Sequence, residues 1–364
     1  MRPLFRPAFR LIVALLCSGV LTACNGGNEP AAMYRNYIAR LGNVTGFEPR
    51  VSEALEEIPP YPRARDLATP EEEVRVGFLT YFALGECQLL QQVSERNSSL
   101  GRVQAASGRL LYEMRFFQQL SACESAVRRS RPEDRDFLDA LASIRRAKEA
   151  NLPRTFWNAT FASLEFRTLL STGAPALQRN ETLSLGDVEA ALGVLTHLGR
   201  NLLERPPDLD LAALEGQYYH LQAGKPVGKL VHGLHLSRHF LAQATEILRQ
   251  TAEANRLCPM GNKTPRGGYL FNVLVTFYAG EVQPYISALH RQSAPLLAKL
   301  HRLRQVETVE PPGAFVDFYD RWLNPESADG LWLNFDRAVK EHTQAWQRVL
   351  QQCAMMPQGP GDLR

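Results

Sequence analysis

The sequence contains few of the patterns by which enzymes are identified. It has no GxxxxGK[ST] phosphate loop, no GxSxG or SxxK nucleophile motif and no HExxH zinc motif. It also has no CxxC pair, so the cysteine spacing does not suit a structural zinc site. Alternating apolar and polar runs, which are typical of β-strands, are scarce. These absences exclude the enzyme classes that carry those motifs and disfavour a β-rich fold.

Long apolar runs and an excess of basic charge are missing beyond the N-terminus. No stretch of 18 apolar residues follows residue 23, so no membrane-spanning helix is predicted there. The whole chain has 41 basic and 38 acidic residues, and three of the arginines lie in the first 23 residues, which contain no acid. The remainder is therefore formally neutral, with 38 residues of each sign. Nucleic acid is not an expected partner of such a chain.

The first 23 residues have the layout of an export signal. A cationic segment contains Arg2, Arg6 and Arg10, and an apolar segment, Leu11–Leu21, follows it. That apolar segment is shorter than the roughly 20 residues that a membrane-spanning helix needs. The pattern predicts a secretory signal peptide at Met1–Ala23.

The end of this signal resembles the bacterial lipobox. The residues Leu21-Thr22-Ala23-Cys24 place small side chains directly before a cysteine. The resemblance implies cleavage between Ala23 and Cys24 and attachment of diacylglycerol to the thiol of Cys24. The alternative is an ordinary signal peptide followed by an incidental cysteine. Residues 24–30 are polar and contain glycine and proline, which predicts a lipidated tether.

The lipobox resemblance also implies a location. Residue 25 is Asn rather than Asp, and in the best-studied sorting systems Asp at this position retains a lipoprotein in the inner membrane. We therefore expect the chain in the cell envelope, on the periplasmic face of the outer membrane. The membrane would be contacted through the N-terminal lipid, another envelope protein or a cell-wall component is the expected partner, and no cofactor is expected.

Four of the six cysteines remain for disulfides. Cys17 would leave with the signal and Cys24 would be acylated. The others are Cys87, Cys123, Cys258 and Cys353. In an oxidising periplasm four cysteines suggest two disulfides, for which three connectivities exist. An antiparallel helical hairpin turning near residue 105 would place Cys87 opposite Cys123, which favours the pairs 87–123 and 258–353.

Helical periodicity dominates after residue 70 and predicts an all-α, multi-helix bundle, with two packed helical subdomains as one form of it. Thr69-Pro70-Glu71 has the composition of a helix start, so a helix is expected from residue 71 to about 95. A helix start is also expected at Pro153, and Pro284 is expected to kink or divide its helix. The other helices are expected at about 110–129, 132–150, 185–203, 208–222, 228–257, 267–303, 312–323 and 327–354. The expected units are the subdomains 71–170 and 185–354, followed by a flexible tail at 355–364.

Residues 31–70 are expected to form a short helix and an extended segment. Asn36–Leu41 suits a helix, whereas Pro49, Pro59, Pro60 and Pro62 favour extended chain. We call residues 46–68 the strap, and we expect it to lie over the bundle with Ile58 and Tyr61 as its anchors.

Three histidines form the most suggestive cluster. His232, His235 and His239 are spaced so that they share one face of a helix, where imidazoles can bind zinc, copper or haem iron. No carboxylate partner neighbours them, and three ligands on one straight helix converge poorly on a single metal. Packing or surface roles are the favoured interpretation, and no metal site is assigned.

Several segments together resemble a known family. Gly85-Glu86-Cys87-Gln88-Leu89, the run from Arg96 to Gly101, Tyr112-Glu113 and Cys123, combined with the lipobox, look like a family of proteobacterial lipoproteins catalogued as a domain of unknown function. The resemblance implies an envelope location and no activity. Within the run from Arg96 to Gly101, Asn and Ser are interpreted as helix caps rather than ligand contacts.

These observations favour a non-enzymatic envelope protein that binds an envelope protein or a cell-wall component. Two alternatives stay open. One is an envelope hydrolase with an unrecognised site, for which a cavity with converging Glu and His side chains would be needed. The other is metal or haem binding at His232, His235 and His239.

Overall fold

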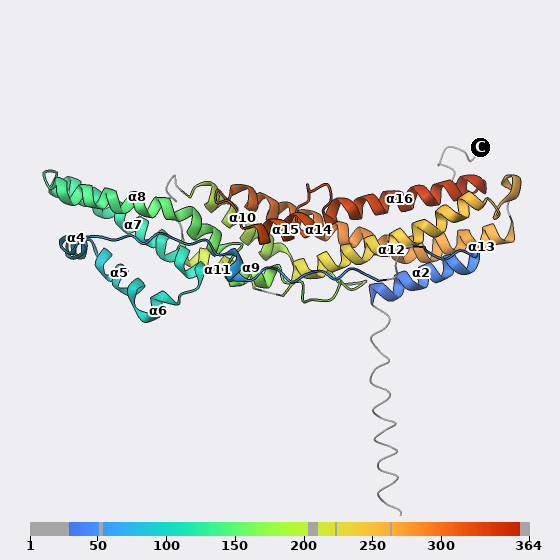
Figure 1. The fold of residues 1–364 in the computed structure, drawn as a ribbon, viewed down its shortest axis with the longest axis horizontal. Helices are drawn as coiled ribbons and strands as arrows, with labels where there is room; N and C mark the ends of the chain where they lie inside the picture. The colour runs from blue at the N-terminus through green and yellow to red at the C-terminus, as the bar shows by residue number, and fades with distance from the viewer. Residues whose placement is uncertain (1–28, 51–53, 203–209, 223, 263, 357–364) are drawn as a thin grey trace, which may run out of the picture.

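The computed structural model describes residues 29–50, 54–202, 210–222, 224–262 and 264–356, and within these ranges it contains helices and no strand. The prediction of an all-α bundle is therefore confirmed. The helices form one elongated body (Figure 1). The predicted signal peptide, Cys24 and most of the tether and of the tail lie outside the described residues, so these remain predictions.

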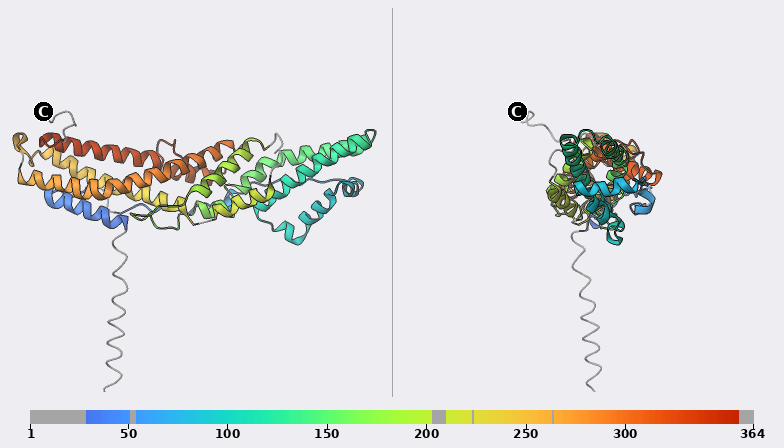
Figure 2. Two further views of the ribbon diagram at one scale, coloured as in Figure 1. Left: turned by 180° about the vertical axis from the view of Figure 1, so that it is seen from behind. Right: turned by 90° about the vertical axis from the view of Figure 1, so that its left-hand side faces the viewer.

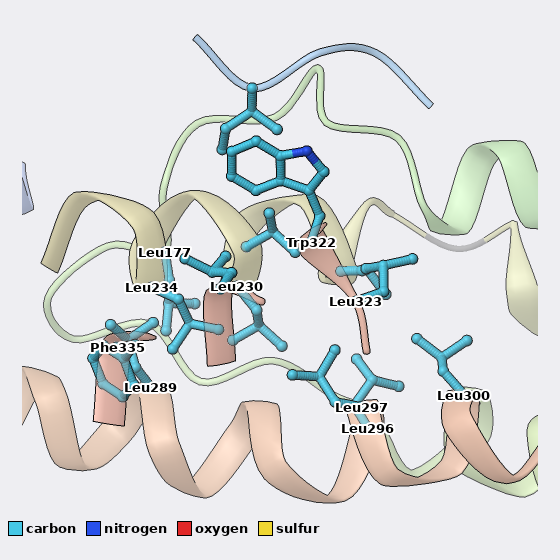
Figure 3. Packing of buried hydrophobic residues seen from close by; sticks show 14 of the residues in the cluster. Leu177, Leu230, Leu234, Leu289, Leu296, Leu297, Leu300, Trp322, Leu323 and Phe335 are labelled. Atoms are coloured by element: carbon cyan, nitrogen blue, oxygen red, sulfur yellow. The ribbon is translucent and has the colours of Figure 1, made fainter. Parts of the chain in front are cut away.

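The thicker part of the body is built around α12 (Pro226–Ala254), the longest helix of the described chain. It packs against α16 (Leu331–Gln352), α2 (Pro30–Thr45) and α14 (Gln283–Val306) (Figure 2). Leu230 and Leu234 of α12 meet Leu289 and Leu297 of α14 beneath Trp322 (Figure 3). This apolar cluster continues into the helices that complete the thicker part: α3 (Ala64–Leu67), α9 (Leu164–Leu169), α10 (Gly186–Arg200), α11 (Leu211–Leu221), α13 (Pro265–Val273) and α15 (Gly313–Trp322).

The thinner end is a helical hairpin with a smaller core of its own. Helices α7 (Ala106–Ser130) and α8 (Arg135–Ala159) project together from the body (Figure 1). One face of α7 places Leu110 and Met114 in the main core, and another face places Phe116 and Leu120 in the smaller cluster. That cluster is completed by residues of η1 (Leu84–Cys87) and α5 (Leu89–Asn97), which lie between α4 (Phe78–Ala83) and α6 (Ser99–Arg102). The division into subdomains at residues 71–170 and 185–354 stays a prediction.

The described residues of the strap, 46–50 and 54–68, are extended apart from the single turn of α3, and they lie along the body between α2 and α4 (Figure 1). Ile58 and Tyr61 are both buried. The Tyr61 hydroxyl donates to the Phe161 carbonyl at 2.8 Å, and the Trp157 indole N–H donates to the Leu67 carbonyl at 2.8 Å. The strap is therefore attached to the bundle by both apolar burial and hydrogen bonds.

The predicted helix start at residue 71 is wrong, because residues 69–77 continue the extended chain. The amide of Asn158 accepts from the Thr69 N–H and donates to the Thr69 carbonyl, both at 2.8 Å. Asn151 makes the same pair of bonds with Glu72, at 2.8 and 2.6 Å. Asn151 and Asn158 are seven residues apart on a helix, and Thr69 and Glu72 are three residues apart in extended chain. Both separations are about 10 Å, so the two amides can bind the backbones of Thr69 and Glu72 at the same time.

Two expectations about proline also changed. The predicted helix start at Pro153 is wrong, because α8 runs through this residue from Arg135 to Ala159. Pro284 does not divide its segment, because α13, η3 (Leu274–Val282, a π-helix) and α14 follow one another without a break. The Gln283 N–H donates to the Tyr278 carbonyl five residues back. This wider turn directly before Pro284 accommodates a residue that lacks a backbone N–H.

Two disulfides join Cys87 to Cys123 and Cys258 to Cys353, which is the pairing favoured from the sequence. The first attaches η1 to the middle of α7. The second joins the short helix η2 (Pro259–Gly261), which follows α12, to the end of α16. Each bond therefore lies near one end of the elongated body (Figure 1). Among the described helices, none is both long and apolar enough to cross a bilayer.

Candidate functional site

A large cavity lies at the thinner end, between α5, α7, α8 and the extended residues 71–76. We call it the charged hollow; its volume is about 780 Å³, which is within the usual range for ligand pockets. Acidic and basic side chains line it together with apolar ones. Its lining residues are Glu71, Glu72, Glu73, Val74, Arg75, Val76, Leu84, Val93, Arg96, Asn97, Arg102, Arg109, Tyr112, Glu113, Phe116, Ile144, Lys148 and Asn151.

A buried ion network forms the floor of the charged hollow. The Glu113 carboxylate is 4% exposed and accepts from Lys148 Nζ through both oxygens at 2.8 Å. Arg109 lies 3.0 Å from Glu113 and 3.3 Å from Glu71. Burial lowers the pKa of Lys148, and the neighbouring Glu113 carboxylate counteracts that effect. Attraction between these opposite charges therefore stabilises the network, which joins the extended chain at Glu71 to α7 and α8.

Aromatic rings lie beside this network. Lys148 Nζ lies 4.7 Å from the ring centre of Phe116 and 5.1 Å from that of Tyr112. The Arg109 guanidinium lies 5.2 Å from the Tyr112 ring centre. Cations over ring faces are stabilised when water is excluded, so the rings further support the charges of the floor.

Some arginine donors that line the charged hollow have no acceptor among the described residues. Arg96 donates from Nη1 to the Gly101 carbonyl at 2.8 Å, but its Nε has no acceptor within the described ranges. Arg109 Nη1 also lacks an acceptor there. The exposed Arg102 side chain has no ion pair in the described part of the chain. The two unsatisfied atoms of Arg96 and Arg109 are buried, whereas the Arg102 side chain is exposed and could bind a carboxylate or phosphate in the cavity.

The remaining wall of the charged hollow is apolar. It consists of short side chains from residues 74–76, from η1 and from the facing helices; these are Val74, Val76, Leu84, Val93 and Ile144. A ligand that fits the whole cavity would therefore combine an anionic group with an apolar part.

The charged hollow brings together segments that the sequence separates. Arg96, Asn97, Tyr112 and Glu113, all from the motifs behind the family resemblance, line it. The disulfide of Cys87, another of those motifs, fastens η1 to α7 beside it. The capping role expected in this run is present, because Ser98 Oγ accepts from the Gly101 N–H at 3.0 Å. Asn97 and Arg96 also face the cavity, which the sequence interpretation did not include.

Sequence reasoning missed Lys148 and the acidic residues 71–73 as parts of a site. A signal existed for Lys148: it follows Leu141 and Ile144 at helical spacing, on the buried face of α8. A lysine at such a position is rarely buried unless it is paired. No comparable signal existed for Glu71, because its role depends on the extended course of residues 69–77.

The three candidate histidines bind separate groups. His232 Nε2 lies 2.6 Å from the Thr172 carbonyl, and His235 Nε2 lies 2.8 Å from the Glu56 carbonyl. His239 Nε2 lies 2.9 Å from the Gln243 amide. Within the described residues no group of three or more His, Cys, Asp and Glu side chains is placed to hold a metal ion. The imidazoles instead connect α12 to the strap, to the loop after α9 and to α12 itself.

His235 borders a second cavity of about 410 Å³, formed by α12, α15, the strap and the loop before α16. Carboxylates of Asp317, Asp320 and Asp329 also line it. His235 is buried, lies edge-on to Trp322 and uses Nε2–H for the Glu56 carbonyl, while its Nδ1 faces Arg238 at 3.4 Å. Burial lowers its pKa. Because both ring nitrogens are engaged, His235 holds the strap and does not supply a general base.

No curated protein and no solved structure matches the chain. A family does match, over residues 34–357, which is most of the chain and includes the charged hollow. The protein therefore belongs to the family described as protein of unknown function (DUF3080).

Proposed function

We propose that this protein is a lipid-anchored, non-enzymatic protein of the bacterial envelope that binds an envelope component in the charged hollow. The component is a cell-wall or protein segment that carries a carboxylate or phosphate next to an apolar group. The observation that carries the proposal is the cavity itself, which the exposed side chain of Arg102 and a set of apolar side chains line together.

The lipobox residues Leu21-Thr22-Ala23-Cys24 support the envelope location. Two disulfides in a chain of this size also favour an exported protein, because cytosolic proteins rarely keep disulfides. Attachment of acyl chains at Cys24 would hold the body close to a bilayer.

The ion network of the floor supports binding rather than catalysis. Glu113 is fully engaged by Lys148 and Arg109, so its carboxylate is committed to holding the cavity together. The hydrolase alternative finds no support at the second cavity either, where both nitrogens of His235 are in use.

Photocrosslinking in intact cells tests the proposal. A photoreactive amino acid replaces Asn97, which lines the charged hollow, in the full-length chain. We expect a specific adduct that disappears when Arg102→Glu is added, because the carboxylate repels an anionic ligand. Digestion of the cell wall before analysis distinguishes a wall fragment, whose adduct shrinks, from a protein.

The matched control places the same photoreactive group at Thr276, which is exposed on η3 at a distance from the cavity. An adduct that forms equally from both positions, or one that is unchanged by Arg102→Glu, would show that the charged hollow does not bind the proposed ligand.

A further inference from the structure

Helix α6 exposes the two least buried large apolar side chains of the described chain. Leu100 is 81% exposed and Val103, directly after the helix, is 77% exposed. Neither lies in an apolar cluster of the bundle. Two adjacent aliphatic side chains left in water lose the free energy that burial would provide, so they indicate a surface that is covered by something else.

The α6 turn is firmly built. Arg96 donates to the Gly101 carbonyl, and Ser98 accepts from the Gly101 N–H. A Cβ at Gly101 would lie 2.2 Å from the Glu95 carbonyl oxygen, so only glycine allows α6 to fold this closely against α5. Leu100 and Val103 are therefore presented on an ordered turn.

This turn lies on the same edge of the molecule as the start of α2. In Figures 1 and 2 the first turn of α2 and the α6 turn are both at the lower edge of the body, under its thicker and its thinner part. Cys24 precedes Glu29 by five residues, which span at most about 18 Å when extended. A bilayer that holds acyl chains on Cys24 is thereby confined to that edge.

The side chains around the turn suit a lipid headgroup region. Ser98 and Ser99, directly before Leu100, are polar and exposed. Such polar side chains stay hydrated at the headgroup level while neighbouring aliphatic side chains enter the acyl boundary.

We propose that the α6 turn inserts Leu100 and Val103 into the surface of the phospholipid bilayer, as a second membrane contact that lays the long axis of the protein along the membrane. This inference rests on the proposed acylation of Cys24. Its occupant is the lipid surface, and a protein partner at α6 is an alternative that the test distinguishes.

The test uses the full-length acylated protein in vesicles of phosphatidylethanolamine and phosphatidylglycerol. Leu100→Cys is labelled with an environment-sensitive fluorophore, and part of the lipid carries nitroxide quenchers. We expect a blue-shifted emission and at least a twofold loss of intensity with quencher lipid. The control, Gln344→Cys, is exposed on α16 at the opposite edge and should show neither effect.

Equal quenching of the two labels would overturn the proposal. So would a Leu100→Cys label that is shielded in native envelopes but not in pure lipid vesicles, because that result indicates a protein partner. Adding Val103→Glu should reduce the quenching at Leu100→Cys without releasing the protein. If the protein does not enter the vesicles and mass spectrometry finds no acyl chains on it, the proposed anchor at Cys24 is wrong. That outcome differs from an acylated protein whose α6 turn stays out of the bilayer.

Discussion

At the scale of single residues, hydrogen bonds between buried polar side chains fix how the helices pack against one another. Tyr37 accepts from Trp346 Nε1 and donates to His342 Nε2, both at 2.8 Å, and His342 Nδ1 lies 3.0 Å from Thr245 Oγ1. Burial lowers the pKa of His342 to about 3, so its imidazole stays neutral and can act in this chain of bonds. Such satisfied buried groups fix the relative positions of α2, α12 and α16.

The amide of Asn151 holds extended chain against α8. Asn151→Ala removes both hydrogen bonds between the buried amide of Asn151 and the backbone of Glu72. We expect a loss of about 1–3 kcal/mol of unfolding free energy, measured by urea denaturation. Asn272→Ala, at an exposed position of α13, is the control and should change stability by less than about 0.5 kcal/mol. Equal effects of the two changes would contradict the role assigned to Asn151.

A buried carboxyl gives the protein a distinctive pH dependence. Glu307 accepts from Thr160 Oγ1 at 2.6 Å, while its Oε2 has no partner among the described residues. Burial raises the pKa of Glu307 from 4.5 to about 8. Between about pH 4.5 and about pH 8 the folded protein therefore keeps the Glu307 proton that the unfolded chain has lost. The contribution of Glu307 to the free energy of unfolding falls as the pH rises through this range.

Glu307→Gln replaces the carboxyl with a neutral group of the same shape. We expect the stability of the variant relative to wild type to increase between pH 5 and pH 8.5, by an amount on the order of a few kcal/mol. Urea midpoints at the two pH values measure this difference. A difference that does not change with pH would show that Glu307 titrates normally.

At the scale of secondary-structure elements, close approach of backbones decides where helices meet. A Cβ at Gly228, in the first turn of α12, would lie 2.0 Å from the Ser171 carbonyl oxygen. Gly193, in the middle of α10, has open space at the same position. Close packing of the backbone therefore requires glycine at position 228 but not at position 193.

Gly228→Ala should lower the unfolding free energy by about 1–3 kcal/mol, because the backbone after α9 must move. Gly193→Ala should raise it by about 1 kcal/mol, because alanine favours an exposed helix interior. Thermal unfolding of both variants checks the contrast. A stable Gly228→Ala variant would show that the contact between α12 and Ser171 is not required.

Elements with strong local periodicity were predictable from the sequence, and those set by distant contacts were not. The ranges expected for α10, α12, α15 and α16 agree with the structure within a few residues. Residues 69–77 carry a local helix-start signal, but two asparagines of α8 bind their backbone in extended form. The charged hollow could not be predicted from the sequence either, because its walls come from segments that meet only in the folded chain.

At the scale of the whole molecule, shape and attachment point constrain what the protein does. The described chain begins just before α2, at the lower edge of the thicker part of the body, and the elements that line the charged hollow lie at the thinner end (Figure 1). Anchoring at Cys24 together with insertion of the α6 turn would lay the body along the membrane, with the charged hollow near the membrane surface.

Mass spectrometry of the N-terminal peptide tests the anchor most directly. The full-length protein is extracted from bacterial envelopes with detergent, digested and analysed beside a Cys24→Ser variant. We predict that the wild-type peptide begins at Cys24 and carries diacylglycerol, and that the variant peptide carries no lipid. A wild-type peptide that begins at Met1, or that begins near residue 24 without acyl chains, would contradict the account.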